Sequence, residues 1–424
     1  MSSFNHFEKR LAQLLKKFPL VKKVLKRGYQ YLNYFLFKNK RKEFFYNSLR
    51  KFSFQDSETF FGYYDKSPIN IGNNIVLWHS VNQDKRNKHP NNSFIEVVVY
   101  DLVKESVINT YQTTTWNWQQ GARLQWLTSD KYAFNDFDEN LNKFITRVYS
   151  IQEDYELKRF EFPIQDAFKN QYFLSLNYTR LNTLRPDYGY RNLPNLSETE
   201  LNTLNNDGIW YVDYKTGEGK LLISLETIVN FKYKDSFNAG KHYVNHIMIS
   251  PNGDKFIFLH RYFLNGVRND RLIQSDLQGN MRLLSEHNMI SHYYWFGNSK
   301  VFGYMRGEDG TDGYYTINCE ESSMILYDDE ELQKYGDGHP NICGKKFVTD
   351  IYPDKSRTQT LIYGDLKRKE HIVLAHLHNN LKYDGEYRCD LHPRFSHDGT
   401  KVFFDTVHYG KRELCMMDLK DISI

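Results

Sequence analysis

The sequence predicts an all-β fold, a seven-bladed β-propeller with an N-terminal basic helical extension. First, a short strand, an Asn-Gly or Asp-Gly turn and an apolar strand recur along the chain. Second, a His stands at the same register in four copies, at steps of 46, 47 and 53 residues, as expected for blades of four strands. Third, Tyr and Phe are abundant, with aromatic residues at 16%, which favours strands.

The clearest copy lies between residues 386 and 419. A short strand ends at Ser396, a turn follows at Asp398, residues 402–404 are apolar, and a closing strand ends at Leu419. Alternating strands and tight turns are typical of antiparallel hairpins. We therefore expect three strands of one blade here.

Other copies complete the count. One has Gly121 in place of the His, and two less regular units start near Tyr64 and near Leu176, the second with a long insertion over residues 184–206. Seven units make seven blades the natural closure, with six and eight as alternatives. The repeated histidines are His246, His292, His339 and His392.

Residues 1–50 are expected to form a basic amphipathic helical segment ahead of a propeller over residues 51–424. Twelve Lys and Arg and no acidic residue lie between Lys9 and Lys42. Apolar residues recur at helical spacing before Pro19, and they are Phe7, Leu11, Leu14, Leu15 and Phe18. Such a segment suits an anionic membrane surface. The alternative is a helical hairpin packed on the propeller flank.

The sequence shows no secretory signal and no apolar run long enough to span a membrane. The four Cys have no metal-type or redox-type spacing, so free thiols in a reducing compartment are expected. We therefore expect a cytoplasmic protein, with peripheral association at the inner membrane face as the option that the basic segment adds.

Charge is divided unevenly along the chain. The total is +4, but residues 1–42 contain twelve cations and only one acid, Glu8, which leaves residues 43–424 at −7. Phosphate binding requires a concentrated basic surface. A nucleic acid is therefore not expected as the main partner.

The four histidines are expected to meet around the propeller axis, because equal register in successive blades brings residues to one ring. Imidazoles from several blades, with a nearby carboxylate, can bind a divalent metal. One imidazole can also act as a general base. The alternative is that each imidazole hydrogen-bonds to the backbone or to an Asp. The candidate metal ligands are His292, His339, His392 and Asp390.

Several cations fall close to the same ring in the repeat pattern. Cations at the mouth of an otherwise acidic domain suit an anionic oligosaccharide or polysaccharide, such as one containing uronic acid. The alternative is that each cation pairs with an inter-blade Asp or a carbonyl. The candidate substrate-binding residues are Lys66, Arg123, Arg185 and Arg394.

The repeats resemble TolB-type (PD40) propeller repeats, and residues 240–420 also resemble the oligogalacturonate lyases. The second resemblance is carried by Asn245-His246, by Ser291-His292 and by His392-Pro393-Arg394. It implies His292 and His392 as ligands of a divalent metal such as manganese, with His246 and Arg261 as catalytic candidates. The chain departs from the family at Asp390, where the family motif has His, and at Tyr387, where it has a Gln ligand.

This resemblance implies a carbohydrate-active propeller, a metal-dependent lyase that cleaves uronic-acid-containing oligosaccharides by β-elimination. The alternative function is a non-catalytic glycan-binding or scaffold propeller in surface-polysaccharide biosynthesis at the inner membrane face. The opening motif Phe61 to Pro68 favours this alternative. A protein-interaction propeller is the third reading.

Overall fold

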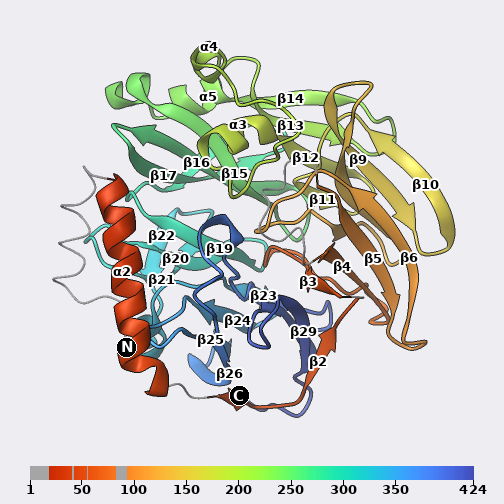
Figure 1. Cartoon of the computed structure of the whole chain (residues 1–424). Helices are drawn as coiled ribbons and strands as arrows, with labels where there is room; N and C mark the ends of the chain where they lie inside the picture. The colour runs from red at the N-terminus through yellow and green to blue at the C-terminus, as the bar shows by residue number, and fades with distance from the viewer. Residues whose placement is uncertain (1–18, 41–42, 55, 83–92) are drawn as a thin grey trace.

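Seven antiparallel sheets are arranged around a central axis (Figure 1). The computed structural model describes residues 19–40, 43–54, 56–82 and 93–424. The predicted all-β class and the seven blades are confirmed, and six or eight blades are excluded. The strands run from the axis outward in chain order within each blade, except at the closure.

The blades are built from the following strands. Blade 1 contains β3 (Ser57–Phe60), β4 (Ile75–Asn82), β5 (Ile95–Asp101) and β6 (Ser106–Thr113). Blade 2 contains β7 (Gln125–Trp126), β8 (Lys131–Asp138), β9 (Lys143–Ser150) and β10 (Glu153–Phe160). Blade 3 contains β11 (Asp166–Phe168), β12 (Tyr172–Leu176), β13 (Gly208–Asp213) and β14 (Gly219–Ser224). Blade 4 contains β15 (Lys241–Ile249), β16 (Lys255–Leu264), β17 (Val267–Asp276) and β18 (Met281–Ser285). Blade 5 contains β19 (Ile290–Phe296), β20 (Lys300–Arg306), β21 (Asp312–Asn318) and β22 (Ser323–Leu326). Blade 6 contains β23 (Asn341–Cys343), β24 (Lys346–Ile351), β25 (Thr358–Asp365) and β26 (Glu370–His378), with β1 (Phe44–Phe45) as a fifth, outer strand. Blade 7 contains β27 (Arg394–Phe395), β28 (Lys401–Thr406), β29 (Glu413–Asp418) and β2 (Leu49–Phe52).

The ring is closed by a strand from near the N-terminus. The C-terminal segment supplies three strands, as expected, and β2 pairs antiparallel with β29 as the outer fourth strand. Phe52 of β2 is buried against Trp78 and Phe403, so it joins the first and last blades. Sheet pairing begins at Phe44, ahead of the boundary expected at residue 50.

Two blades begin earlier than the sequence pattern indicated. The first starts at Ser57 and the third at Asp166, rather than near Tyr64 and Leu176. Both innermost strands are only three or four residues long, so they lack a visible alternation. The insertion after β12 contains α3 (Tyr178–Leu184) and α4 (Glu198–Asn202). The remaining short helices are α5 (Leu225–Asn230), α6 (Glu330–Tyr335), η4 (Asp235–Ala239) and η5 (Gly385–Tyr387).

The blades pack face to face through apolar side chains, and buried hydrogen bonds join them. At six of the seven junctions, counted over the described ranges, a buried side chain accepts a hydrogen bond from a backbone N–H of the following blade. The acceptor and donor residues are His79 and Ala122, Asn135 and Ile164, Asp166 and Ile249, Asp270 and Ile290, Asp350 and His392, and Asp405 and Gly62. Hydrogen bonds to charged groups contribute about 1.5–3 kcal/mol each.

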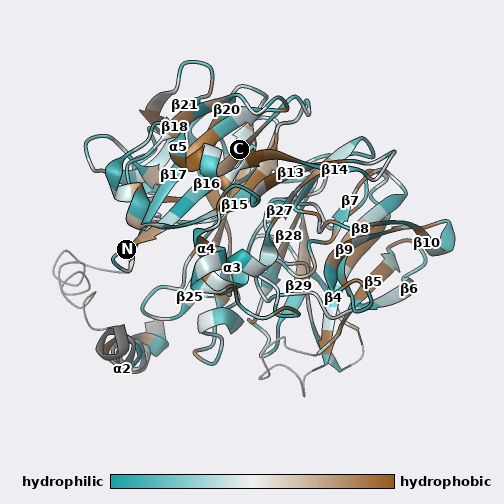
Figure 2. Cartoon of the chain, turned by 90° about the horizontal axis from the view of Figure 1, so that it is seen from above, coloured by the Kyte–Doolittle hydropathy of each residue, from teal (hydrophilic) through white to brown (hydrophobic). Residues whose placement is uncertain are grey.

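Helix α2 (Pro19–Phe37) lies beside the propeller and continues into η2 (Lys38–Lys40) (Figures 1 and 2). Arg27 Nη1 pairs with Asp384 Oδ2 at 2.8 Å, and its Nη2 donates to the Leu381 carbonyl at 3.0 Å. The helical pattern expected from Phe7 to Phe18 lies outside the described residues. Among the helices that the structure describes, none combines the length and the apolar character needed to cross a membrane.

We expect Arg123→Ala to destabilise the propeller by about 3 kcal/mol, because it would leave the buried Asp65 carboxylate without its hydrogen-bonded partner and with only the Lys66 ammonium at 3.9 Å. Arg123 binds both Asp65 oxygens, at 3.0 and 2.8 Å, and donates to the Gln165 carbonyl. Arg159→Ala is the control, because Arg159 pairs with Asp138 at the surface, where ion pairs contribute about 0–1 kcal/mol. Urea unfolding of the three proteins measures both losses; equal losses would contradict the prediction.

Candidate metal centre and adjoining cavity

Four imidazoles from consecutive blades meet around the buried Tyr63 ring, as their common register predicted. The ring centroids of His246 and His292 are 6.0 Å apart, those of His292 and His339 are 3.9 Å apart, and those of His339 and His392 are 4.3 Å apart. The Tyr63 centroid lies between 5.0 and 6.5 Å from all four. All four histidines are buried.

Irregular backbone turns these side chains toward the axis. The β15–β16 register shifts between Asn245 and Met248, and His246 inside this bulge has a φ of 53°. His392 has a φ of 45° just before β27. A bulge or a left-handed residue re-aims a side chain out of the strand alternation, at a cost in backbone energy.

Each imidazole has a different neighbour. Tyr63 Oη lies 2.5 Å from His246 Nδ1. His292 Nδ1 lies 3.0 Å from Ser291 Oγ and 3.5 Å from a carboxylate oxygen of Asp337. His339 Nδ1 lies 2.8 Å from Asp350 Oδ1. Hydrogen bonds to neighbouring side chains therefore orient three of the four imidazoles. This matches in part the alternative that each imidazole hydrogen-bonds to the backbone or to an Asp.

Three residues of the ring can hold a metal ion. One ligand atom each from His339, Asp390 and His392 lies within 4.8 Å of the others, and all three residues are buried. His392 Nε2 is buried and has no hydrogen-bond partner among the described residues. An orphaned imidazole nitrogen beside a carboxylate and a second imidazole is a donor set that suits a divalent transition metal. His292 lies beside this group but outside it.

Burial and, after it, the neighbouring charges shift the pKa values of the imidazoles. Burial lowers the pKa of His392 well below its usual value, and the neighbouring His339 lowers it further, so His392 is neutral and able to ligate. Burial also opposes the charged form of His339, but Asp350 outweighs it and the pKa of His339 is raised. Burial and the charge of Arg261 lower the pKa of His246.

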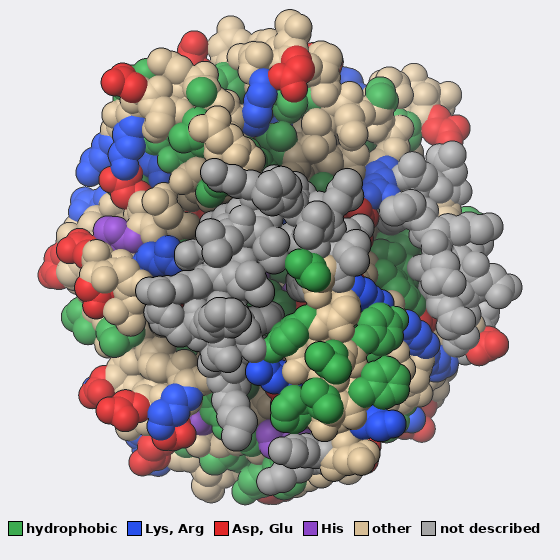
Figure 3. Space-filling view, turned by 60° about the vertical axis from the view of Figure 1, so that its left-hand side comes forward, with side chains coloured by type: hydrophobic (Ala, Val, Ile, Leu, Met, Phe, Trp, Pro, Cys, Tyr) green, Lys and Arg blue, Asp and Glu red, His purple; other side chains and the backbone are tan. Residues whose placement is uncertain are grey.

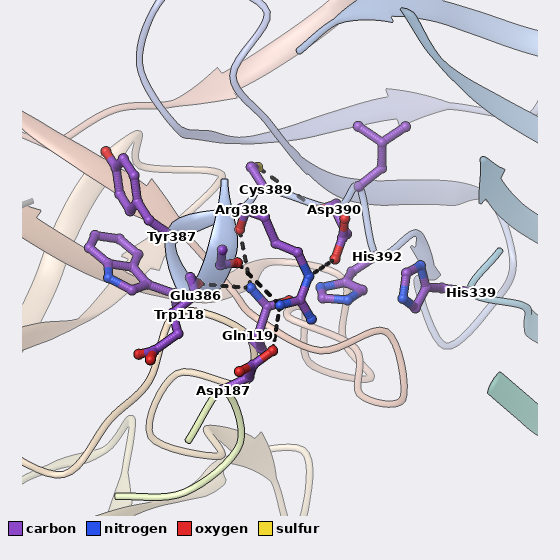
Figure 4. A network of polar contacts seen from close by, with 12 residues as sticks. Trp118, Gln119, Asp187, His339, Glu386, Tyr387, Arg388, Cys389, Asp390 and His392 are labelled. Carbon is purple, nitrogen blue, oxygen red and sulfur yellow. Dashed lines mark hydrogen bonds and ion pairs between the residues drawn. The ribbon is translucent and has the colours of Figure 1, made fainter. Parts of the chain in front are cut away.

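Arg388 connects the carboxylate of this group to the insertion of blade 3 (Figure 4). Its Nε donates to Asp390 Oδ2 at 2.9 Å, and its Nη1 donates to Asp187 Oδ2 at 2.7 Å. Burial alone would lower the pKa of Arg388, but Asp390 and other neighbours raise it. A hydrogen-bonded partner of this kind orients a metal-binding carboxylate.

A cavity of about 310 Å³ adjoins the metal-capable group. Asp390, Arg388 and Tyr352 form the wall beside the histidines, and the Tyr352 ring lies 5.5 Å from that of His339. Helix α2 forms the facing wall with Tyr29, Gln30 and Asn33. Arg357 and Lys355 add positive charge to the lining. The volume is at the lower end of the range for ligand pockets.

The structure does not bring most of the predicted cations to this cavity. Arg123 pairs with Asp65, Arg394 with Asp405 at 2.9 Å, and Arg261 with Asp270 at 3.0 Å, all buried. Lys66 pairs with Asp166 and lines a separate cavity of about 410 Å³. Arg123 and Lys66 thus pair with an Asp of another blade, whereas Arg261 and Arg394 pair within their own blade and donate to a carbonyl of the following blade, at Ile290 and Gly62. Both arrangements match the alternative of an inter-blade Asp or a carbonyl.

Arg185 lies nearer to the ring. Its guanidinium is 5.4 Å from the Tyr188 ring centroid, which in turn is 5.4 Å from that of His246. Arg185 and Tyr188 belong to the insertion of blade 3, so this insertion approaches the histidines from the side.

Blade 2 has Gly121 at the position of the histidines for a steric reason. Its φ is 57°, and a Cβ there would lie 2.2 Å from the His79 ring. The ring of His79 fills the place that a side chain would take, and burial lowers the pKa of His79 to about 3.

Sequence reasoning missed several residues of the site. Tyr63 stands inside the opening motif Phe61 to Pro68 but was not assigned to the site, and Asp350, Arg357 and Arg388 carry no motif of their own. One usable signal was the Arg388-x-Asp390 spacing, since residues two apart in extended backbone point to the same side. The others are brought to the ring by contacts between distant segments.

No protein-family model and no curated protein matches the sequence. Solved structures do match. An oligogalacturonate lyase in complex with manganese aligns at a TM-score of 0.60 and 14% identity, over 90% of this chain and 96% of that one. An oligogalacturonate lyase from Vibrio parahaemolyticus aligns at 0.58 and 13%, with the same coverage. TolB from Acinetobacter baumannii aligns at 0.41 and 13%, over 77% and 73%.

In its fold, the protein is an oligogalacturonate lyase-like seven-bladed β-propeller. The resemblance inferred from the repeats is therefore confirmed at the level of the fold. Identities of 13–14% leave the activity to be argued from the site itself.

We expect the protein to bind one manganese ion, and Asp390→Asn and His392→Ala to weaken binding by at least about a hundredfold, because even outer-shell partners contribute about 10–100-fold. Elemental analysis after incubation with manganese and gel filtration measures the content, and isothermal titration measures the affinity.

His371→Ala is the matched control, because His371 also pairs with an Asp, Asp329 at 2.7 Å, but stands on β26 outside the ring. Melting curves of all variants establish that they fold. Stoichiometric manganese in His392→Ala, or equal loss in His371→Ala, would contradict the assigned ligands.

Proposed function

We propose that the protein is a metal-dependent lyase that cleaves uronic-acid-containing oligosaccharides by β-elimination. The observation that carries the proposal is the buried group of His339, Asp390 and His392, with His246 in the same ring and a cavity beside it. The fold shared with oligogalacturonate lyases, one of them in complex with manganese, supports it.

The reaction requires a base, a carboxylate site and a way to stabilise negative charge. The base removes the proton on the carbon next to the uronate carboxyl, the neighbouring C–O bond to the linked sugar breaks, and a double bond forms between the two carbons. The leaving oxygen takes up a proton from solvent. A divalent ion, when bound, would supply the positive charge that offsets the enolate character of the transition state.

His246 is the candidate base. Its lowered pKa keeps the imidazole neutral and able to accept a proton. Tyr63 Oη lies within 3.0 Å of both ring nitrogens, and Tyr293 Oη donates to the His246 carbonyl at 2.5 Å, so both the ring and its backbone are held.

Arg357 is the best-placed cation for the substrate carboxylate. It takes the role that the sequence had suggested for Arg123 and Arg394, which are paired with buried carboxylates. It lines the cavity and has no carboxylate at ion-pair distance within the described ranges. Its Nε and Nη2 donate to Asn379, at 3.0 and 2.5 Å, which holds the guanidinium plane while Nη1 has no such bond. A guanidinium held in this way suits recognition of a carboxylate.

The lyase proposal is tested by ultraviolet absorbance of the unsaturated product, using manganese-loaded protein and a panel of uronic-acid oligosaccharides. We expect activity in the wild type and a loss of kcat by about 10²–10⁴-fold in His246→Ala, the range for a general base. His371→Ala should keep wild-type activity. Product formation without loss in His246→Ala would remove this residue from the mechanism.

Arg357→Ala should raise KM by about tenfold or more with a smaller change in kcat, because loss of a charge-assisted contact weakens substrate binding. Arg357→Lys should restore part of the affinity. Arg306→Ala is the control, since Arg306 pairs with Asp312 on β21, at the surface. Unchanged KM in Arg357→Ala would contradict the assigned carboxylate site.

The second candidate is a non-catalytic glycan-binding or scaffold propeller. It is favoured by the depth of the ring, because all four histidines are buried and three of them contact Tyr63, Asp337 or Asp350. Saturable binding of uronic-acid oligosaccharides without any product, in protein that holds manganese, would support this function over the lyase.

A further inference from the structure

Helix α2 presents an apolar face to solvent. Leu32 is 58% exposed, and Phe35 and Leu36 are each 63% exposed. Leu25 and Tyr31 extend the same exposed side of the helix. Spacings of three, four and seven residues place Leu25, Leu32, Phe35 and Leu36 on one stripe. Large apolar side chains gathered in this way on a surface mark an interaction site.

This face points away from the propeller. Asn33, which is buried, and Tyr29 and Gln30, which line the cavity, lie on the part of α2 that is turned to the propeller, beside the exposed stripe. Arg27 fixes this orientation through Asp384 and the Leu381 carbonyl. The apolar stripe is therefore not part of the contact between α2 and the blades.

Two more exposed aromatic residues follow soon after α2 and η2 in the chain. Phe44 and Tyr46 are exposed, and their rings meet edge to face. Figure 3 shows hydrophobic side chains gathered and bordered by Lys and Arg on the side of the molecule where α2 lies.

The sequence of the helix carries charge of one sign. Residues 19–40 contain six Lys and Arg and no acidic residue, in a chain whose residues 43–424 carry −7. Lys38 Nζ lies 5.4 Å from the Phe35 ring centroid, so a cation stands at the edge of the apolar stripe. An apolar stripe flanked by cations is the arrangement of helices that lie in the interface of anionic membranes.

We propose that α2 docks the protein on an anionic lipid bilayer, with Leu25, Leu32, Phe35 and Leu36 inserted among the acyl chains. The Lys38 ammonium, beside the Phe35 ring, then lies at the level of the lipid headgroups. Because residues of α2 beside the stripe line the cavity, docking places the cavity wall next to the membrane and gives the propeller a defined orientation on it.

The test is vesicle flotation of the full chain, with phosphatidylcholine alone and with phosphatidylcholine that contains phosphatidylglycerol. We expect binding only to the anionic vesicles, weakening as salt is added. The variant Leu32→Ser/Phe35→Ser/Leu36→Ser should lose at least about tenfold in apparent affinity, because several buried apolar side chains are removed.

The matched control is Ile71→Ser/Val103→Ser/Ile325→Ser, which removes three exposed apolar side chains on other blades and should bind as the wild type does. Melting curves and light scattering accompany both variants. The proposal is overturned if the wild type binds neither vesicle, or if the α2 variant floats as well as the control. It is also overturned if the α2 variant changes only the oligomeric mass, because the patch would then join two copies.

Discussion

Buried hydrogen bonds between successive blades hold the rest of the structure in place. At junctions such as Asp405 with Gly62, a side chain of one blade accepts from the backbone of the next. Apolar packing between sheets is strong but non-directional, so by itself it would let blades slide or rotate. A polar acceptor bonded to a particular N–H sets the relative position of the two blades at six junctions, and at four of these the acceptor is a buried carboxylate, which is costly to leave unpaired.

The same bonds assemble the candidate metal centre. Asp350 accepts from the His392 backbone and binds the His339 ring, so one carboxylate of blade 6 positions two candidate ligands from two blades. Asp270 holds Ile290, two residues before His292. The geometry of the ring therefore follows from the way in which the blades are joined, and Arg388 adds the link to the insertion.

Helix α2 makes one end of the propeller different from the other. Part of its surface forms a wall of the cavity, and the part beside it carries an exposed apolar stripe. The two ends of a ring of similar blades resemble each other, and an added helix at one end makes the two ends different. In this chain the helix stands at the end where Asp390 meets the cavity.

The sequence by itself determined the propeller, its seven blades and the meeting of His246, His292, His339 and His392, because equal register in repeated strands places residues on one ring. It did not reveal the closing strand β2, since that pairing joins residues at opposite ends of the chain. Nor could it separate the cations. Arg123 and Arg394 are neutralised by buried carboxylates, whereas Arg357 is bonded to an amide and lines the cavity. Only the tertiary structure decided this, because the partner of a charged group is chosen by distance in space and by burial, and neither is written in the local sequence.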